Sequence, residues 1–252
     1  MALNGAAAIT LGGVGVVLFG IAWATRAPPV ALATAEVRLA RWQAQHRAHD
    51  VDPSTQPFVG GFLRVADALA RPLARIGILP NAVTALTMWL ALWVPVLAAP
   101  QRHWPLAAAA AILISALGDG LDGSIAALTD RSTAFGFVLD SVADRVADAA
   151  FVVALVLAGG IDWWGATAGA TVGLFEYTRA RASVAGYSGV GVVTVGERPT
   201  RVVAAVIGML ACGTAPRSAE FIGTATLVMV TAASLIGLVQ LGVVLIRRPP
   251  DP

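Results

Sequence analysis

The sequence predicts an all-helical integral membrane protein that crosses a bilayer several times. Hydrophobic residues make up 57% of its 252 residues and charged residues only 13%, a balance typical of polytopic membrane proteins rather than soluble domains. Several stretches reach the ~20 mostly apolar residues that a helix needs to cross the hydrocarbon core. The 17 basic residues are all arginine and gather in alternate connecting segments, as the positive-inside rule predicts.

Seven apolar windows are candidate transmembrane helices. They are 5–25, 81–99, 104–128, 134–158, 163–185, 201–215 and 220–246. The first window lacks the basic start and the small-residue cleavage site of a signal peptide, so we expect an uncleaved helix. Glycines and arginines interrupt the chain from 179 to 201, which leaves the ends of the fifth and sixth windows the least defined.

The placement of the arginines predicts the orientation of these helices. With the N-terminus outside, only Arg102 and Arg217 lie on the outer side, and the other fifteen arginines lie in the cytoplasm. Trp104, Trp163 and Trp164 then lie at the outer interface, where aromatic side chains are enriched. Since the chain is also rich in alanine and free of lysine, we expect a multi-pass protein of a cell membrane, the plasma membrane of a bacterium.

Two segments of different character separate the first two windows. Residues 33–57 are polar and end in turn formers, which predicts a short helix and a linker. Residues 58–80 predict an amphipathic helix lying in the cytoplasmic interface, with Pro72 as a candidate kink. Its apolar stripe is Phe62, Val65, Ala66, Leu69, Leu73 and Ile76. We therefore divide the chain into an N-terminal transmembrane helix with a polar cytoplasmic linker, 1–57, and a membrane domain, 58–252.

Four aspartates lie inside otherwise apolar windows, at Asp119, Asp122, Asp140 and Asp144. The first two are three residues apart and the last two four apart, so each pair shares one helix face. Two antiparallel helices with a short connection would direct all four carboxylates to one point near the cytoplasmic surface. Because carboxylates packed together repel one another unless cations neutralise them, the pattern predicts a site for hard divalent cations, Mg²⁺ or Mn²⁺.

Two other interpretations of these aspartates stay open. They could be paired structurally with arginines and helix termini, although acidic residues at membrane depth usually mark functional sites. They could also belong to a cation or proton pathway of a transporter, although the four collect near one surface instead of following a route. The single cysteine, Cys212, excludes an intrachain disulfide and any site built from several cysteines. The arginines follow the membrane topology, which gives no indication of nucleic-acid binding.

The spacing of the aspartates resembles the signature of the CDP-alcohol phosphotransferase (CDP-alcohol phosphatidyltransferase) family. The pattern in this chain is Asp119-x-x-Asp122-Gly123-x-x-Ala126-(nine residues)-Gly136-x-x-x-Asp140-x-x-x-Asp144. It departs from the family at Ala127, where the family has an arginine that helps to hold the CDP-linked substrate, and Arg131 is a candidate substitute. Pro80 to Thr84, "PNAVT", resembles the start of the family's first span. Residues 176–201 look like a region of the actinobacterial phosphatidylinositol-phosphate synthases.

This resemblance covers about 58–246 and implies a core of six transmembrane helices, preceded by the interfacial helix and by one extra N-terminal transmembrane helix. It implies phospholipid biosynthesis: transfer of a phosphatidyl group from CDP-diacylglycerol to the hydroxyl of a polar acceptor, with release of CMP. The four aspartates would bind two Mg²⁺ or Mn²⁺ ions, and Asp144 would also be the catalytic base. A homodimer is expected, with membrane lipid as the source of the donor. The resemblance assigns donor binding to Asn81, Ala82, Val83, Thr84, Gly123, Ala126, Thr133 and Gly136. We add Arg131 to these donor-binding residues as the candidate substitute for the arginine missing at Ala127.

The acceptor is the least defined part of the prediction. Arg179, Arg198 and Arg201 are candidate ligands of an anionic acceptor, because the guanidinium group binds phosphate through paired hydrogen bonds; positive-inside placement alone is the alternative. We therefore expect a phosphorylated acceptor, inositol phosphate or glycerol 3-phosphate. Open alternatives are a cardiolipin synthase of the same family that uses phosphatidylglycerol, an inactive homologue that binds CDP-lipid, and the transporter.

Overall fold

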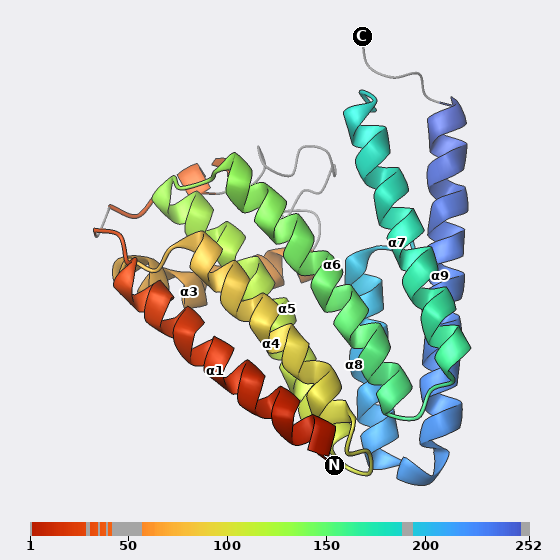
Figure 1. Cartoon of the computed structure of the whole chain (residues 1–252). Coiled ribbons are helices and arrows are strands. Elements are labelled where there is room, and N and C mark those ends of the chain that lie inside the picture. Colours follow the sequence, from red (N-terminus) through yellow and green to blue (C-terminus); the bar gives the residue numbers. More distant parts are fainter. Residues whose placement is uncertain are drawn as a thin grey trace. The chain divides into compact units, whose positions relative to one another are not determined.

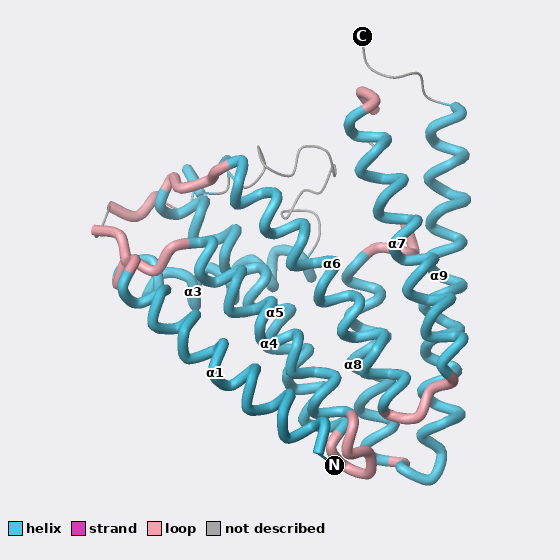
Figure 2. Tube along the Cα trace, in the orientation of Figure 1, coloured by secondary structure: helices cyan, strands magenta, loops and turns pink. Residues whose placement is uncertain are grey.

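The computed structural model describes residues 2–28, 31–34, 36–38, 40–41, 57–187 and 194–247. Within these residues every regular element is a helix (Figure 2). In chain order they are α1 (Ala2–Ala24), α3 (Pro57–Arg75), α4 (Pro80–Ala98), α5 (Pro105–Thr129), α6 (Ala134–Leu157), α7 (Asp162–Val184), α8 (Arg198–Thr214), the short 3-10 helix η2 (Pro216–Ser218) and α9 (Ala219–Arg247) (Figure 1). The predicted all-helical class is confirmed.

Each of the seven predicted windows coincides with a helix. In the described part of the chain, four segments are long and apolar enough to cross a membrane: Gly5–Ala24, Pro80–Ala98, Pro105–Thr129 and Pro216–Arg247. Helices α6, α7 and α8 are not among them, since α6 and α7 carry several charged residues and α8 has only 17 residues. A membrane protein with several spanning helices is therefore supported, and the six-helix core stays a prediction.

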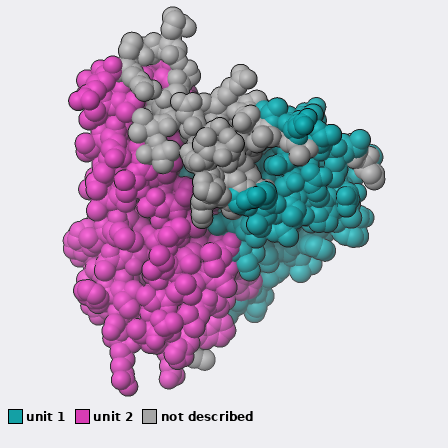
Figure 3. Space-filling view, turned by 180° about the vertical axis from the view of Figure 1, so that it is seen from behind, with its two compact units in different colours: residues 1–90, 114–146 teal, residues 91–113, 147–252 magenta. Residues whose placement is uncertain are grey.

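The chain packs into two compact units, which Figure 3 shows in different colours. The first contains residues 1–90 and 114–146, and the second contains residues 91–113 and 147–252. Helices α4, α5 and α6 each contribute residues to both units. The units follow packing, whereas the boundary predicted after residue 57 follows composition and resemblance, and that boundary stays a prediction.

The first unit packs around a small hydrophobic cluster. Its buried members come from three helices: Ala70 and Ala74 from α3, Val83 from α4, and Ile125 and Leu128 from α5. The indole N–H of Trp89 on α4 donates a hydrogen bond of 2.7 Å to the carbonyl of Leu11, which attaches α1 to α4. Helices α3 and α4 therefore pack against the end of α5 that follows Asp122, and α1 is attached to α4.

The predicted amphipathic helix exists as α3, and it runs through Pro72 to Arg75. Its alanines at positions 66, 70 and 74 are buried against the protein, whereas Val65, Leu69 and Ile76 are about half exposed. Of the predicted apolar stripe, Ala66 and Leu73 pack against the protein, together with Ala70 and Ala74, which were not predicted to belong to it. Val65, Leu69 and Ile76 of the stripe are available to the lipid interface, as helices of this kind require.

The second unit contains α7, α8 and α9, with α9 packed along both of the others (Figure 1). Close approach requires small residues at the contacts. A methyl group on Gly208 of α8 would lie 2.7 Å from the hydroxyl oxygen of Thr226 on α9, and 3.1 Å from Leu155 on α6. The unit also holds the three arginines predicted to bind the acceptor.

Candidate active site

Three of the four predicted carboxylates form one cluster in the first unit. Asp119 lies on α5, and Asp140 and Asp144 lie on α6, which begins after a connection of residues 130–133. One oxygen from each of the three side chains lies within 4.8 Å of the other two, and all three residues are partly buried. The predicted convergence of the two helix faces is therefore observed for these three aspartates.

Asp122 is bound differently from the other three. It is buried, and its Oδ2 accepts a hydrogen bond from the hydroxyl of Thr84 on α4. Its Oδ1 accepts a second bond of 2.6 Å from the backbone N–H of Gly123. Thr84 was predicted as a donor-binding residue, and its contact with Asp122 was not. The contact attaches the start of α4 to the acidic segment of α5.

The cluster has the geometry of a site for a small divalent cation. Mg²⁺ binds oxygen ligands at about 2.1 Å, so two oxygens on opposite sides of the ion are separated by roughly 4.2 Å. Carboxylate oxygens are the ligands that Mg²⁺ and Mn²⁺ favour. The oxygens of Asp119, Asp140 and Asp144 all lie within 4.8 Å of one another, which is the range of separations that such a coordination shell needs. These residues fit the predicted metal.

Three predicted donor-binding residues lie together at the starts of α4 and α6. The backbone N–H of Gly136 donates a bond of 2.9 Å to Oγ1 of Thr133. A methyl group on Gly136 would lie 2.7 Å from Oδ1 of Asn81 and 3.0 Å from the same threonine oxygen. Glycine is therefore required at position 136 for the two polar side chains to keep these places.

The other predicted donor-binding residues have varied surroundings. Val83 and Ala126 are buried, and Val83 belongs to the hydrophobic cluster of the unit, whereas Ala82 is partly exposed. Gly123 faces open space, since a methyl group built on it would meet nothing within 4 Å. The guanidinium of Arg131 donates a bond of 3.1 Å to the carbonyl of Pro28. Donor binding by these residues stays a prediction, and the open side of Gly123 beside the acidic segment is the feature that best suits it.

The predicted acceptor arginines lie in the second unit, and Arg201 has a structural role there. It is buried, and its Nη2 lies 2.9 Å from Oδ2 of Asp148 and 2.7 Å from Oε1 of Glu176. Its Nη1 donates to the carbonyl of Gly196. Arg201 therefore connects α8 to α6, to α7 and to the segment before α8.

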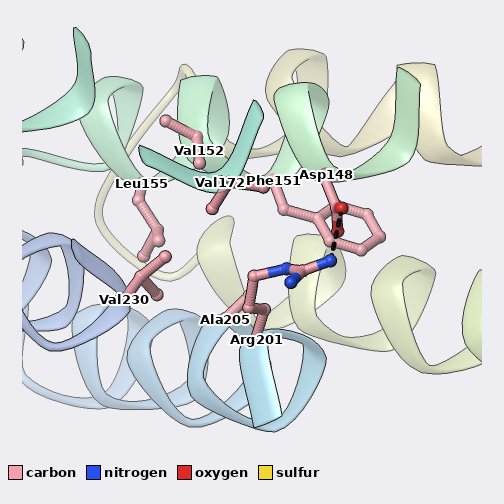
Figure 4. Close-up of a pocket in the computed structure, with 8 residues that line it drawn as sticks. All are labelled: Asp148, Phe151, Val152, Leu155, Val172, Arg201, Ala205 and Val230. Carbon is pink, nitrogen blue, oxygen red and sulfur yellow. Dashed lines mark hydrogen bonds and ion pairs between the residues drawn. The ribbon is translucent and has the colours of Figure 1, made fainter. Parts of the chain in front are cut away.

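A small pocket adjoins the ion pair of Arg201 and Asp148. Figure 4 shows the guanidinium directed at the carboxylate, with apolar side chains around the rest of the pocket. The lining residues are Asp148, Phe151, Val152, Leu155, Val172, Arg201, Ala205 and Val230. Because the lining is otherwise apolar, the ion pair lies in surroundings of low polarity, where an unpaired charge is costly.

Arg179 and Arg198 lie near the opposite ends of the segment that joins α7 to α8. Nη2 of Arg179 lies 3.4 Å from Oε1 of Glu197, a longer contact than those of Arg201. Arg198 is the first residue of α8 and is partly exposed. Binding of the acceptor by these arginines stays a prediction.

Comparisons with known proteins match most of the chain after α3. The sequence profile of the family described as "CDP-alcohol phosphatidyltransferase" matches residues 77–245. An archaetidylinositol phosphate synthase of Pyrococcus horikoshii is 32% identical over 148 residues, which cover 57% of this chain and 76% of that protein. A phosphatidylinositol phosphate synthase of Mycobacterium marinum is 32% identical over 171 residues, which cover 62% of this chain and 69% of that protein.

Two solved structures of the phosphatidylinositol phosphate synthase of Mycobacterium tuberculosis have similar folds. The structure with CDP-DAG bound has a TM-score of 0.54 and 26% identity, and the match covers 70% of this chain and 91% of that one. The structure in complex with manganese and citrate has a TM-score of 0.56 and 27% identity, with 69% and 86% of the two chains covered. Helix α1 and the segment up to residue 76 lie outside the region matched by the family profile.

Proposed function

This chain belongs to the CDP-alcohol phosphatidyltransferase family, and on that premise we propose that it transfers a phosphatidyl group from CDP-diacylglycerol to a hydroxyl of inositol phosphate and releases CMP. The family predicted from the aspartate signature is thereby confirmed. The observation that carries the proposal is the convergence of the carboxylate oxygens of Asp119, Asp140 and Asp144 within 4.8 Å. No other described group of residues offers comparable ligands for the divalent cation that phosphoryl transfer uses.

The relatives favour inositol phosphate among the predicted acceptors. The archaeal and mycobacterial relatives are named for different lipids, archaetidyl and phosphatidyl, and both names contain inositol phosphate. What the names share is thus the acceptor, while the lipid differs. Glycerol 3-phosphate and phosphatidylglycerol remain acceptors to be tested against it.

The proposed reaction assigns a role to each part of the site. When bound, Mg²⁺ or Mn²⁺ would neutralise the negative charge of the phosphates. The family resemblance implies two such ions. Asp119, Asp122, Asp140 and Asp144 hold the metal site, and Thr84 orients the buried carboxylate of Asp122. Asp144 accepts the proton of the acceptor hydroxyl. The acceptor oxygen forms a bond to the phosphorus that carries diacylglycerol, and the bond from that phosphorus to the oxygen of CMP breaks.

The proposed function also includes an acceptor-binding site, a side of the membrane and an oligomeric state. We assign the phosphate of the acceptor to Arg179, Arg198 and Arg201, because guanidinium groups bind phosphate well. The arginine distribution along the sequence supports an active site at the cytoplasmic face of a cell membrane. The donor then enters from the membrane lipid, and the polar acceptor enters from the cytoplasm. A homodimer is proposed from the family resemblance.

The test is release of CMP by the purified full-length protein in detergent. The protein is supplied with CDP-diacylglycerol, Mg²⁺ or Mn²⁺, and one of inositol phosphate, glycerol 3-phosphate, phosphatidylglycerol or free inositol. We expect release that needs the metal and inositol phosphate and that is lost in Asp144→Asn. Release of CMP only with a different acceptor would show that the acceptor is not inositol phosphate. A protein that binds the donor and releases no CMP with any acceptor would be an inactive homologue, and cation flux in proteoliposomes would indicate the transporter.

A further inference from the structure

The C-terminal end of α5 is capped by residues that lie far away in the sequence. Arg41 donates a hydrogen bond of 2.9 Å from Nη1 to the carbonyl of Ala127. The backbone N–H of Ala33 donates a bond of 3.0 Å to the carbonyl of Leu128. These carbonyls belong to the last turn of the helix, where the helix itself supplies no partner. The segment before α3 therefore supplies two of the hydrogen-bond donors that this helix end requires.

The same segment is attached at several other points of the first unit. We call its described residues 26–28, 31–34, 36–38 and 40–41 the N-terminal connector. The backbone N–H of Ala27 donates a hydrogen bond of 2.9 Å to the carbonyl of Gly77. Arg38 forms an ion pair with Asp67 on α3, with 3.0 Å between Nε and Oδ1. Leu32 packs against the hydrophobic cluster of the unit. With these attachments, the cap on α5 is a fixed part of the unit.

The turn that leaves α5 also depends on the connector. Asp130 has a φ of 57°, in the left-handed region that non-glycine residues adopt at a cost. The backbone N–H of Arg131 donates a hydrogen bond of 3.1 Å to the carbonyl of Ala126. This is the bond that defines a Schellman motif at a helix C-terminus. Oδ2 of Asp130 lies 3.2 Å from Nη2 of Arg41. One guanidinium thus contacts both the last helical turn and the residue that reverses the chain.

This turn sets the register of the two helices that carry the aspartates. Residues 130–133 join α5 to α6 directly. Asp122 lies five residues before Ala127, about 7.5 Å along the helix axis. We therefore expect a change in the last turn of α5 to shift Asp119 and Asp122 relative to Asp140 and Asp144.

We propose that the N-terminal connector is part of the catalytic unit, and that Arg41 is a positioning residue that holds the end of α5 and the following turn in the register that the metal site needs. The inference extends the proposed function, since it concerns the same aspartates. It assigns a role to a segment that lies outside residues 77–245, the region matched by the family profile. The donors of the cap come from the connector, so a protein without it would keep the aspartates but lose these two hydrogen bonds to the end of α5.

The test combines two measurements on the full-length protein that need no substrate. Hydrogen exchange of the backbone over residues 123–133 reports the cap, and electron paramagnetic resonance of Mn²⁺ reports the affinity of the aspartates. The variants are Arg41→Ala and Arg41→Lys. A third, milder variant is Asp130→Asn, which removes the negative charge that faces Arg41. Asparagine also tolerates the left-handed backbone conformation, so the turn itself is not strained further. The matched control is Arg217→Ala, an exposed arginine of the second unit.

In Arg41→Ala we expect exchange over the last turn of α5 to be about three- to tenfold faster, the equivalent of one lost hydrogen bond. Mn²⁺ affinity should fall several-fold, with smaller changes in the same direction for Arg41→Lys and Asp130→Asn and none in the control. Unchanged exchange in Arg41→Ala and Asp130→Asn would overturn the cap. Faster exchange with unchanged Mn²⁺ affinity would reduce Arg41 to a purely structural residue and overturn the positioning role. CMP release by the wild type is measured in parallel, so failure of the transferase is distinguished from failure of the connector.

Discussion

Gly123→Ala separates the stability of α5 from the function of its surface. Gly123 lies inside the helix, directly after Asp122, and a methyl group built on it meets nothing within 4 Å. Alanine in a helix interior is more favourable than glycine by about 1 kcal/mol. No clash offsets this gain, so the free energy of unfolding should rise by about that amount. In a chain of this size the melting temperature should increase by roughly 2–4 °C.

The same methyl group should impair binding of the donor. If CDP-diacylglycerol occupies the open side of Gly123, the added group overlaps with it. Forcing one extra methyl into a packed contact costs about 1–3 kcal/mol. Since about 1.4 kcal/mol corresponds to a tenfold change in affinity, the KM for the donor should rise roughly 5- to 150-fold.

The assay measures thermal unfolding in detergent and the KM for CDP-diacylglycerol on the same preparations. Gly169→Ala is the matched control, because Gly169 lies inside α7 and its methyl group would also meet nothing within 4 Å. The control should gain the same stability without any change in KM. A lower melting temperature for Gly123→Ala would show that the space is filled by protein. An unchanged KM would show that the donor does not contact this face of α5.

Four further outcomes test the rest of the site. Asp144→Asn should lower the rate of CMP release by about 10²–10⁴-fold, the typical contribution of a general base, without loss of the fold, as measured by thermal unfolding. Chelation with EDTA should abolish CMP release and Mn²⁺ should restore it; activity that persists without metal would contradict the assignment of the cluster. Thr84→Val should leave the buried carboxylate of Asp122 without its hydroxyl partner and cost about 1–3 kcal/mol in denaturant unfolding, whereas Thr84→Ser should retain most of the stability. Arg201→Met should destabilise the protein by about 3–5 kcal/mol, since it leaves carboxylates uncompensated in surroundings of low polarity, and Arg179→Met should have a much smaller effect in the same unfolding assay.

The helices could be predicted from the sequence because the apolar windows are long and sharply bounded. The predicted start at 81 is observed at Pro80, and the predicted start at 104 is observed at Pro105, since proline is favoured in the first turn of a helix. The start of α8 was predicted three residues late, at 201. The helix begins at Arg198, with Pro199 in its first turn, and the charged and polar residues there do not register as part of an apolar window.

The site could be predicted only where its parts are close in sequence. Asp140 and Asp144 share a face because they are one helical turn apart, and the short connection to α5 brings Asp119 to them. The hydrogen bond from Thr84 to Asp122 joins residues 38 positions apart, and the one from Arg41 to Ala127 joins residues 86 positions apart. Such contacts depend on how α4 and the connector pack on α5, and no local periodicity encodes that packing.

The arginines of the second unit show the same limit, and the structure suggests an order among them. In sequence, Arg179 and Arg201 are equivalent candidates for the acceptor phosphate. In the structure Arg201 has only 5% of its side chain exposed and is bound to the carboxylates of both Asp148 and Glu176. A phosphate that approaches it meets two negative charges already in place, and it would have to displace a buried ion pair. Arg179 forms a longer ion pair with Glu197, and its side chain is 22% exposed, so an anion can reach it at a smaller cost in desolvation. The KM for inositol phosphate should therefore depend more strongly on Arg179 than on Arg201, whereas the stability should depend more strongly on Arg201. The KM for inositol phosphate of Arg179→Gln and Arg201→Lys, measured at matched folded fractions, tests this order. The reverse order would show that the ion pairs of Arg201 with Asp148 and Glu176 open to receive the acceptor.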